Sequence, residues 1–118
     1  MGMFNVALRV SDLSGSRSRS VEALVDTGTF YTMLPAALLR EMEIAPTRSV
    51  EFELADGSVV EFGVGHAVAA IDGQEVITPV VFGPDGAEPL LGTYTLEGLR
   101  LTVDPVNEVL TPARRPRL

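Results

Sequence analysis

Residues 24–28 read Leu24-Val25-Asp26-Thr27-Gly28, and this stretch decides how the chain is interpreted. It ends an apolar run that begins at Val21, and a second apolar run, Phe30 to Leu34, follows shortly after it. An aspartate at the end of a buried strand is unusual, because burial disfavours the charged form of a carboxylate. A carboxylate in that place, on a turn made by glycine, indicates chemistry.

The composition limits what that chemistry is. The 118 residues fit one domain, and 46% of them are hydrophobic, which is enough for a folded core. The chain has no cysteine, which excludes disulfides, thiolate metal sites and thiol nucleophiles. Its single histidine, His66, argues against a histidine metal cluster or a serine–histidine pair. We therefore expect no metal and no other cofactor.

The charge of the chain narrows the range of partners. Sixteen acidic residues against nine basic ones give a net charge of −7, which repels nucleic acid and anionic membranes. No apolar stretch is long enough to span a bilayer, and the first residues lack the regions of a signal peptide. We expect no nucleic-acid partner, no membrane partner and a cytoplasmic location, since the absence of cysteine is compatible with a reducing compartment.

Short strands separated by turns run along most of the chain. Asp56-Gly57 and Asp72-Gly73 suit the tight turns that join antiparallel strands. The strongest helix signal is Pro35–Met42, and Thr93–Leu96 is expected to form one helical turn. The expected strands are Met3–Val10, Val21–Thr27, Phe30–Leu34, Val50–Leu54, Val59–Val64, Val68–Ile71, Glu75–Phe82, Leu90–Leu91 and Leu99–Val103.

This pattern predicts an all-β fold, a closed or partly open barrel with one or two short helices. No internal repeat and no linker divides the chain. We expect a single domain over residues 1–110 and a flexible tail over residues 111–118, where the arginines Arg114, Arg115 and Arg117 cluster.

Three elements in a fixed order carry a resemblance to a known family. The first is the apolar-apolar-Asp-Thr-Gly stretch, and the second is a hairpin over Val50 to Val64 with its tip at Ala55-Asp56-Gly57-Ser58. The third is Leu90-Leu91-Gly92 before a short helix. From Met3 to Asp104 the chain resembles the single-domain retropepsin-like aspartic proteases, in their cellular or prokaryotic form rather than their retroviral form. The resemblance implies a retropepsin-like β-barrel with a flap hairpin.

The resemblance also implies an aspartic endopeptidase and assigns roles to individual residues. Asp26 is the implied catalytic residue, and Thr27 and Gly28 are the implied supports of the active site. By resemblance, the Thr27 hydroxyl holds two active-site loops together across a two-fold axis. The expected substrate-binding and flap residues are Thr29, Leu54, Ala55, Asp56, Gly57 and Ser58.

Aspartic proteolysis needs two carboxylates that share one proton. The chain has one Asp-Thr-Gly, because Asp56-Gly57, Asp72-Gly73 and Asp85-Gly86 all lack the intervening Thr or Ser. A chain of 118 residues holds only one lobe, so a protease of this type must be a symmetric homodimer with Asp26 from each subunit. The expected partners are a second copy of the chain and a peptide or protein substrate.

Three positions depart from the retroviral pattern. Thr29 stands where the family usually has Ala or Ser. Phe30 and Thr93 stand where many retroviral members have an Asp and an Arg that form an ion pair supporting the dimer. We expect Phe30 and Tyr31 to supply apolar packing in its place, as in cellular or prokaryotic relatives.

Two alternatives stay open at this level. The departures are compatible with a catalytically weak or inactive retropepsin-like domain that is used for binding or dimerisation. The chain is also compatible with a small β-barrel module unrelated to proteases, in which Asp26 lies in an exposed turn and bonds its own backbone. In either case Glu51, Glu53 and Glu61 alternate with apolar neighbours and predict a solvated sheet face.

Overall fold

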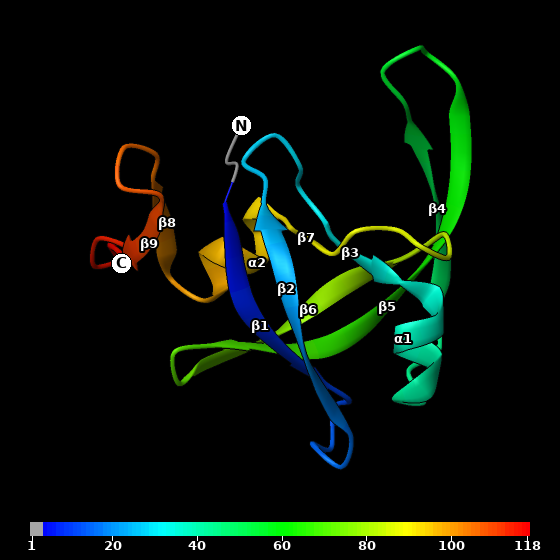
Figure 1. Cartoon of the computed structure of the whole chain (residues 1–118), viewed down its shortest axis with the longest axis horizontal. Helices are drawn as coiled ribbons and strands as arrows, with labels where there is room; N and C mark the ends of the chain where they lie inside the picture. The colour runs from blue at the N-terminus through cyan, green and yellow to red at the C-terminus, as the bar shows by residue number, and fades with distance from the viewer. Residues whose placement is uncertain (1–3) are drawn as a thin grey trace.

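The computed structural model describes residues 4–118, so Met3, where the first strand was expected to begin, lies outside the described residues. The described part of the chain is built mainly from strands, with two short helices (Figure 1). This confirms the predicted all-β fold. The elements are β1 (Asn5–Ser11), β2 (Ser18–Val25), β3 (Thr32–Pro35), α1 (Ala36–Glu41), β4 (Arg48–Glu53), β5 (Val59–Ile71), β6 (Gln74–Gly83), β7 (Leu90–Leu91), α2 (Thr93–Gly98), β8 (Leu101–Asp104) and β9 (Val109–Pro112).

Seven strands form one sheet in the order β1-β2-β7-β3-β6-β5-β4. β1 also pairs with β5, which curls the sheet around its buried face. No helix among residues 4–118 has the length and apolar character needed to cross a membrane. The side chains of one hydrophobic cluster fill the curled sheet, and those that are fully buried include Leu8, Val25, Leu34, Leu39 and Leu91.

Helix α1 begins after Pro35, whose ring fixes φ at −56°, and it ends at Glu41. The observed helix is one residue shorter at each end than expected, a difference within the usual uncertainty of helix boundaries. The side chains of Leu39 and Met42 are fully buried, as expected from their helical spacing. The helix therefore packs its apolar stripe against β3 and β6.

β5 corrects the sequence prediction, which divided this region into two strands with a break near His66. The structure has one continuous strand of 13 residues. Its glycines explain the difference: a Cβ atom on Gly65 would lie 2.7 Å from Ala45 O, and one on Gly63 would lie 2.9 Å from Pro46 Cβ. The glycines let the strand pass close to this segment without a break. This close approach depends on tertiary structure, so the sequence pattern alone does not show it.

The C-terminal hairpin is a second correction. β8 begins at Leu101 rather than Leu99, and β9, which was not predicted, pairs with it. The Asp104 side chain accepts bonds from the Val106 amide (3.0 Å) and the Asn107 amide (3.2 Å), which closes the turn between the strands. β9 includes two residues, 111 and 112, that the sequence assigned to the tail.

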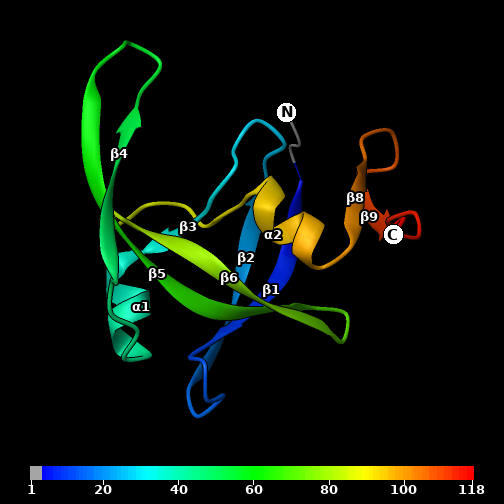
Figure 2. The same cartoon turned by 180° about the vertical axis from the view of Figure 1, so that it is seen from behind.

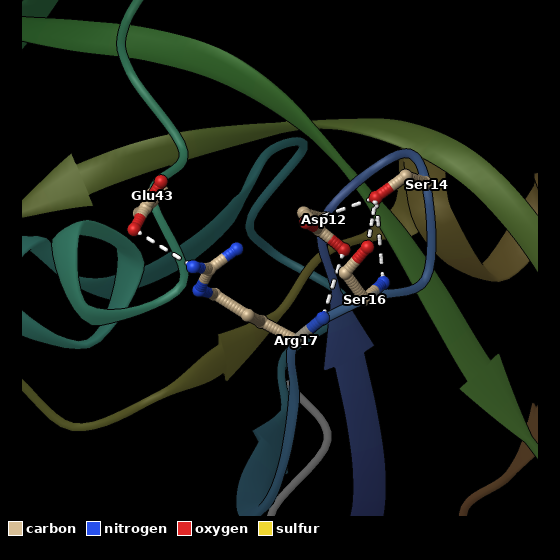
Figure 3. Close-up of polar contacts among 5 residues, drawn as sticks. All are labelled: Asp12, Ser14, Ser16, Arg17 and Glu43. Atoms are coloured by element: carbon tan, nitrogen blue, oxygen red, sulfur yellow. Dashed lines mark hydrogen bonds and ion pairs between the residues drawn. The ribbon is translucent and has the colours of Figure 1, made fainter.

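The turn between β1 and β2 is polar, as expected, but it is shorter than predicted because β2 already begins at Ser18. Asp12 Oδ1 accepts from the Arg17 amide (3.1 Å), and Asp12 Oδ2 accepts from the Ser14 hydroxyl (3.2 Å). The Arg17 amide, with the Ser14 hydroxyl, holds the pKa of Asp12 below its ordinary range. Arg17 also forms an ion pair with Glu43 (2.9 Å), which ties this turn to the end of α1 (Figure 3).

The opposite end of the molecule presents the two segments that matter for function. The loop after β2, which contains Asp26, and the hairpin β4–β5 both project from the body on the same side (top of Figures 1 and 2). α2 lies beneath the loop, and the β8–β9 hairpin lies beyond α2. The fold thus brings together the first and third elements of the sequence pattern and points the hairpin in the same direction.

Candidate active site

Asp26 follows Val25, the last and fully buried residue of β2. Its own amide donates to Leu91 O (3.2 Å), and its carbonyl accepts from the Thr29 amide (3.2 Å). The carboxylate is half-buried, and each of its oxygens accepts one hydrogen bond: Oδ1 from the Gly28 amide (2.9 Å) and Oδ2 from the Thr29 hydroxyl (2.8 Å). The carboxylate is therefore held in one orientation at the surface end of the strand.

The two hydrogen bonds have different significance. A bond from the amide two residues ahead is one that an ordinary turn aspartate also makes. A Cβ atom on Gly28 would lie 3.3 Å from Asp26 Oδ1, so glycine lets the amide approach closely. The bond from Thr29 is a charge-assisted contact between side chains, and it was not foreseen. Thr29 was predicted as a substrate-binding residue, and its hydroxyl instead contacts the carboxylate.

The short strand β7 fixes the loop from below. Leu91 pairs with Val25 in a parallel register, and Leu90 pairs with both Leu24 of β2 and Met33 of β3. Both ends of the Asp26 loop are thus attached to one two-residue strand. This explains physically why an apolar-apolar-Gly sequence accompanies Asp-Thr-Gly in this chain.

α2 begins directly after β7 and supports the loop through its backbone. The Thr93 amide donates to Thr29 O (2.9 Å), and the Tyr94 amide donates to Phe30 O (3.0 Å). A Cβ atom on Gly92 would lie 2.5 Å from Phe30 O, so only glycine fits between the helix and the loop. The first turn of α2 is therefore locked to the residues that follow the carboxylate.

Beneath this contact lies a buried cluster that the sequence reasoning missed, the threonine network of Thr32, Thr78 and Thr95. Thr95 Oγ1 lies 2.6 Å from Thr32 Oγ1 and 2.9 Å from Thr78 Oγ1, and the Gly92 amide donates to Thr32 Oγ1 (3.1 Å). All three threonines are at most 1% exposed. A hydroxyl within an apolar run was the only available signal, since the sequence gives no information about which strands meet.

The hairpin β4–β5, predicted as a flap, projects from the sheet (Figure 1) and ends in a tight turn. At its tip the Leu54 amide donates to Ser58 O (2.8 Å), and Gly57 adopts φ +86°, which suits glycine. Asp56 Oδ1 accepts from the Ser58 hydroxyl and amide, which lowers the pKa of Asp56. The four residues of the predicted tip, Ala55-Asp56-Gly57-Ser58, are all exposed, as is Leu54 before them.

The two faces of this hairpin differ in polarity. Glu51 lies opposite Glu61 in the ladder, and both are exposed, as predicted for a solvated face. Phe52 lies opposite Val60 on the other face, and both are half-buried. Because opposite residues of an antiparallel pair share a face, the β4–β5 hairpin has one acidic face and one apolar face.

A string of aromatic rings joins this apolar face to α2. The ring of Tyr94 contacts Phe30 (centroids 5.4 Å apart), and Phe30 contacts Tyr31 (5.1 Å). Tyr31 then contacts Phe52 of the β4–β5 hairpin (5.6 Å), which contacts Phe62 (5.9 Å). Phe30 and Tyr31 therefore pack against other aromatic rings of the same chain, and their expected role in a dimer stays a prediction. These contacts connect the Asp26 loop with the β4–β5 hairpin.

The described residues, 4–118, hold no group of three or more His, Asp or Glu side chains that is arranged to bind a metal. The two ion pairs found among them, Arg17–Glu43 and Arg19–Glu41, lie away from the Asp26 loop near α1.

No protein-family profile and no curated protein sequence matches the chain. Solved structures do match. Simian foamy virus (mac) protease has a TM-score of 0.54 and 18% identity over 78% of this chain and 92% of its own. EIAV protease in complex with the inhibitor HBY-793 has a TM-score of 0.59 and 17% identity over 80% of this chain and 86% of its own. The chain therefore has the all-β fold of the retropepsin-like proteases.

Proposed function

We propose that the protein is an aspartic endopeptidase that works as a homodimer, with one Asp26 from each subunit. The observation that carries the proposal is the geometry of this carboxylate, held by the Gly28 amide and the Thr29 hydroxyl on a loop anchored to β7 and α2. The retropepsin-like fold supports it. The same fold argues against the alternative of an unrelated β-barrel module.

The reaction requires a second carboxylate, and the sequence supplies it only through a second copy. Two carboxylates that meet across a two-fold axis cannot both ionise, so they share one proton and titrate as a pair. The ionised member removes a proton from a water molecule, whose oxygen attacks the carbonyl carbon of the scissile peptide bond. The protonated member gives its proton to the carbonyl oxygen. Transfer of a proton to the amide nitrogen then breaks the carbon–nitrogen bond and releases the two peptides.

The flap and the charge of the chain suggest the partners. An extended peptide would lie between the Asp26 loop and the apolar face of the hairpin, where Phe52 already contacts Tyr31. Closure of the hairpin over the peptide would exclude water from the reaction. We also propose that the protein acts in the cytoplasm on peptide or protein substrates, without nucleic acid or membrane partners, in line with its net charge and absence of cysteine.

We place the protein with cellular or prokaryotic relatives rather than retroviral ones. Phe30 and Thr93 replace the partners of the retroviral ion pair, and Phe30 packs against Tyr94. The same replacement is the basis for a second candidate function, a retropepsin-like domain of little or no activity that binds or dimerises. The Thr29 hydroxyl is an observation in favour of this candidate, because its hydrogen bond occupies one oxygen of the Asp26 carboxylate.

A cleavage assay on a mixed peptide library separates these functions. Wild type and Asp26→Asn are compared from about pH 3 to 7, the range in which carboxyl pairs titrate. The oligomeric state is measured by sedimentation in the same buffers. Cleavage by the wild type and none by the folded variant is expected. Equal cleavage by both proteins would refute the proposal, and a folded wild type without cleavage would favour the binding domain.

A mixing experiment tests whether the active site is shared between subunits. Wild type is refolded together with an equal amount of Asp26→Asn, so that roughly one quarter of the dimers keep two carboxylates. Activity per wild-type chain should fall to about one half, because half of the wild-type chains pair with the variant. The matched control is Thr102→Val, which changes an exposed threonine of β8 and should leave activity per chain unchanged. If Asp26→Asn has no effect on the wild-type chains, each subunit acts alone.

A further inference from the structure

The threonine network forms a continuous chain of hydrogen bonds. The Gly92 amide donates to Thr32 Oγ1 (3.1 Å) at one end. Thr95 Oγ1 lies 2.6 Å from Thr32 Oγ1 and 2.9 Å from Thr78 Oγ1, and either hydroxyl of each pair can be the donor. At the other end the Thr78 hydroxyl lies 3.4 Å from Pro79 O. The network therefore runs from Gly92 to Pro79 through all three hydroxyls.

The network adds side-chain hydrogen bonds between four elements, of which β3 also pairs with β6 and β7 through the backbone. Thr32 belongs to β3, Thr78 to β6 and Thr95 to α2, and the Gly92 amide comes directly after β7. Thr95 is the central member, since it contacts both of the other threonines. No buried polar side-chain atom within residues 4–118 lacks a partner, so the network is fully satisfied.

This chain of bonds ends beside the catalytic loop. Gly92 is followed by Thr93 and Tyr94, whose amides donate to the carbonyls of Thr29 and Phe30. The Thr29 hydroxyl in turn donates to the carboxylate. α2 has no side-chain cap at its first turn, so its position depends on contacts with the neighbouring elements. The threonine network supplies a fixed contact at the point where the helix meets the loop.

We propose that Thr95 is a positioning residue for catalysis, which acts through the first turn of α2 to hold Thr29 and the Asp26 carboxylate in the reactive orientation. This inference rests on the proposed proteolytic function. A displacement of the helix by a fraction of an ångström would move the carbonyl acceptors of the loop and with them the carboxylate. Small displacements of this kind lower the rate of the chemical step more than the binding of substrate.

The test compares Thr95→Val, which keeps the shape but removes the hydroxyl, with Thr95→Ser, which keeps the hydroxyl. We expect kcat to fall roughly 10- to 100-fold in Thr95→Val with KM within about twofold, and Thr95→Ser to recover kcat to within about threefold. The exchange of the Thr93 and Tyr94 amide protons should become about tenfold faster in Thr95→Val. Thr102→Val is the control, because its hydroxyl pairs with Thr111 at an exposed position (3.0 Å).

The outcomes are separable from those of the proposed function. Unchanged kcat and unchanged amide exchange in Thr95→Val would overturn the positioning role, even if that variant melts at a lower temperature. If Thr95→Val does not fold, Thr78→Val is tested in its place, because it removes only the far end of the chain of hydrogen bonds. It should lower kcat and speed the exchange of the Thr93 and Tyr94 amides. No change in either quantity would equally refute the positioning role of Thr95. If the wild type does not cleave peptides, the proposed function fails, and amide exchange alone decides whether the network positions the loop.

Discussion

Gly92→Ala is the substitution whose effect follows most directly from the structure. The new Cβ atom would lie 2.5 Å from Phe30 O, 2.5 Å from Tyr31 C and 2.6 Å from Tyr31 O. Ordinary van der Waals contact begins near 3.4 Å, so the atom is about 0.9 Å too close. All three neighbours are backbone atoms, and a side-chain rotation cannot relieve the overlap. Either α2 or the catalytic loop must move.

The size of the effect can be worked out from the contacts that such a movement breaks. The bonds from the Thr93 amide to Thr29 O (2.9 Å) and from the Tyr94 amide to Phe30 O (3.0 Å) would lengthen beyond hydrogen-bonding distance. Two lost hydrogen bonds and one overpacked site together destabilise the fold by about 2 to 6 kcal/mol. This is a large part of the roughly 5 to 15 kcal/mol that stabilises a domain. We also expect cleavage to be lost.

Urea denaturation measures the loss in the free energy of unfolding. All proteins are compared at one protein concentration, because the stability of a dimer depends on concentration. The matched control is Gly98→Ala at the other end of α2, where the new Cβ atom would meet Val76 Cγ2 at 2.9 Å. That neighbour is a side-chain methyl rather than backbone, so a shift of a few tenths of an ångström by Val76 relieves the overlap, and alanine favours a helix over glycine by about 1 kcal/mol. Gly98→Ala should therefore stay within about 1 kcal/mol of wild type. Equal destabilisation by the two substitutions would refute the reasoning.

Three further predictions concern the flap, the carboxylate and the C-terminal turn. Phe52→Ala removes the ring contact with Tyr31 (5.6 Å); we expect KM for a peptide to rise about tenfold, since an aromatic pair contributes about 0.5 to 1.5 kcal/mol, and an unchanged KM would contradict it. Thr29→Val should lower kcat by roughly tenfold while Thr29→Ser retains it, because a hydrogen bond to a charged group contributes about 1.5 kcal/mol; equal rates would exclude this role. Hydrogen bonds from the Asn107 side chain and the Asn107 backbone amide lower the pKa of Asp104. The stabilisation that this carboxylate gives the β8–β9 turn is therefore complete above pH 3.8, the ordinary pKa of aspartate, and is lost as the pH falls below that value through the lowered pKa of the folded state. NMR of the turn amides against pH should show this loss in wild type and not in Asp104→Asn.

The parts of the fold that could be predicted from the sequence are those with local signals. The Asp26 loop follows from its apolar flanks and Gly28, and the flap follows from the alternation around Asp56-Gly57. β5 was divided wrongly because the effect of Gly65 depends on its distance to Ala45, which is far from it in sequence. β9 (Val109–Pro112) was missed because no strand was predicted after Val103, and because residues 111 and 112 were assigned to the tail.

The residues that support the Asp26 loop were less predictable than the loop itself. The threonine network depends on Thr32 and Thr78 being brought together by the parallel pairing of β3 with β6, in which Thr32 lies opposite Val80. Such a register is a tertiary property. Thr32 and Thr78 each look like ordinary strand residues in the sequence. The contact between Phe30 and Tyr94 was missed for the same reason, although the need for apolar packing at Phe30 was recognised.

The internal support of the loop bears on how a dimer would form without the retroviral ion pair. The amide of Asp26 bonds to β7, and the carbonyls of Thr29 and Phe30 bond to α2, all within one subunit. The loop is therefore ordered before a second copy arrives, and association does not have to supply the free energy of ordering it. Preorganisation of this kind lowers the affinity that the interface itself must provide. In the proposed dimer, apolar packing near Phe30 would therefore have to supply less free energy to bring two carboxylates together.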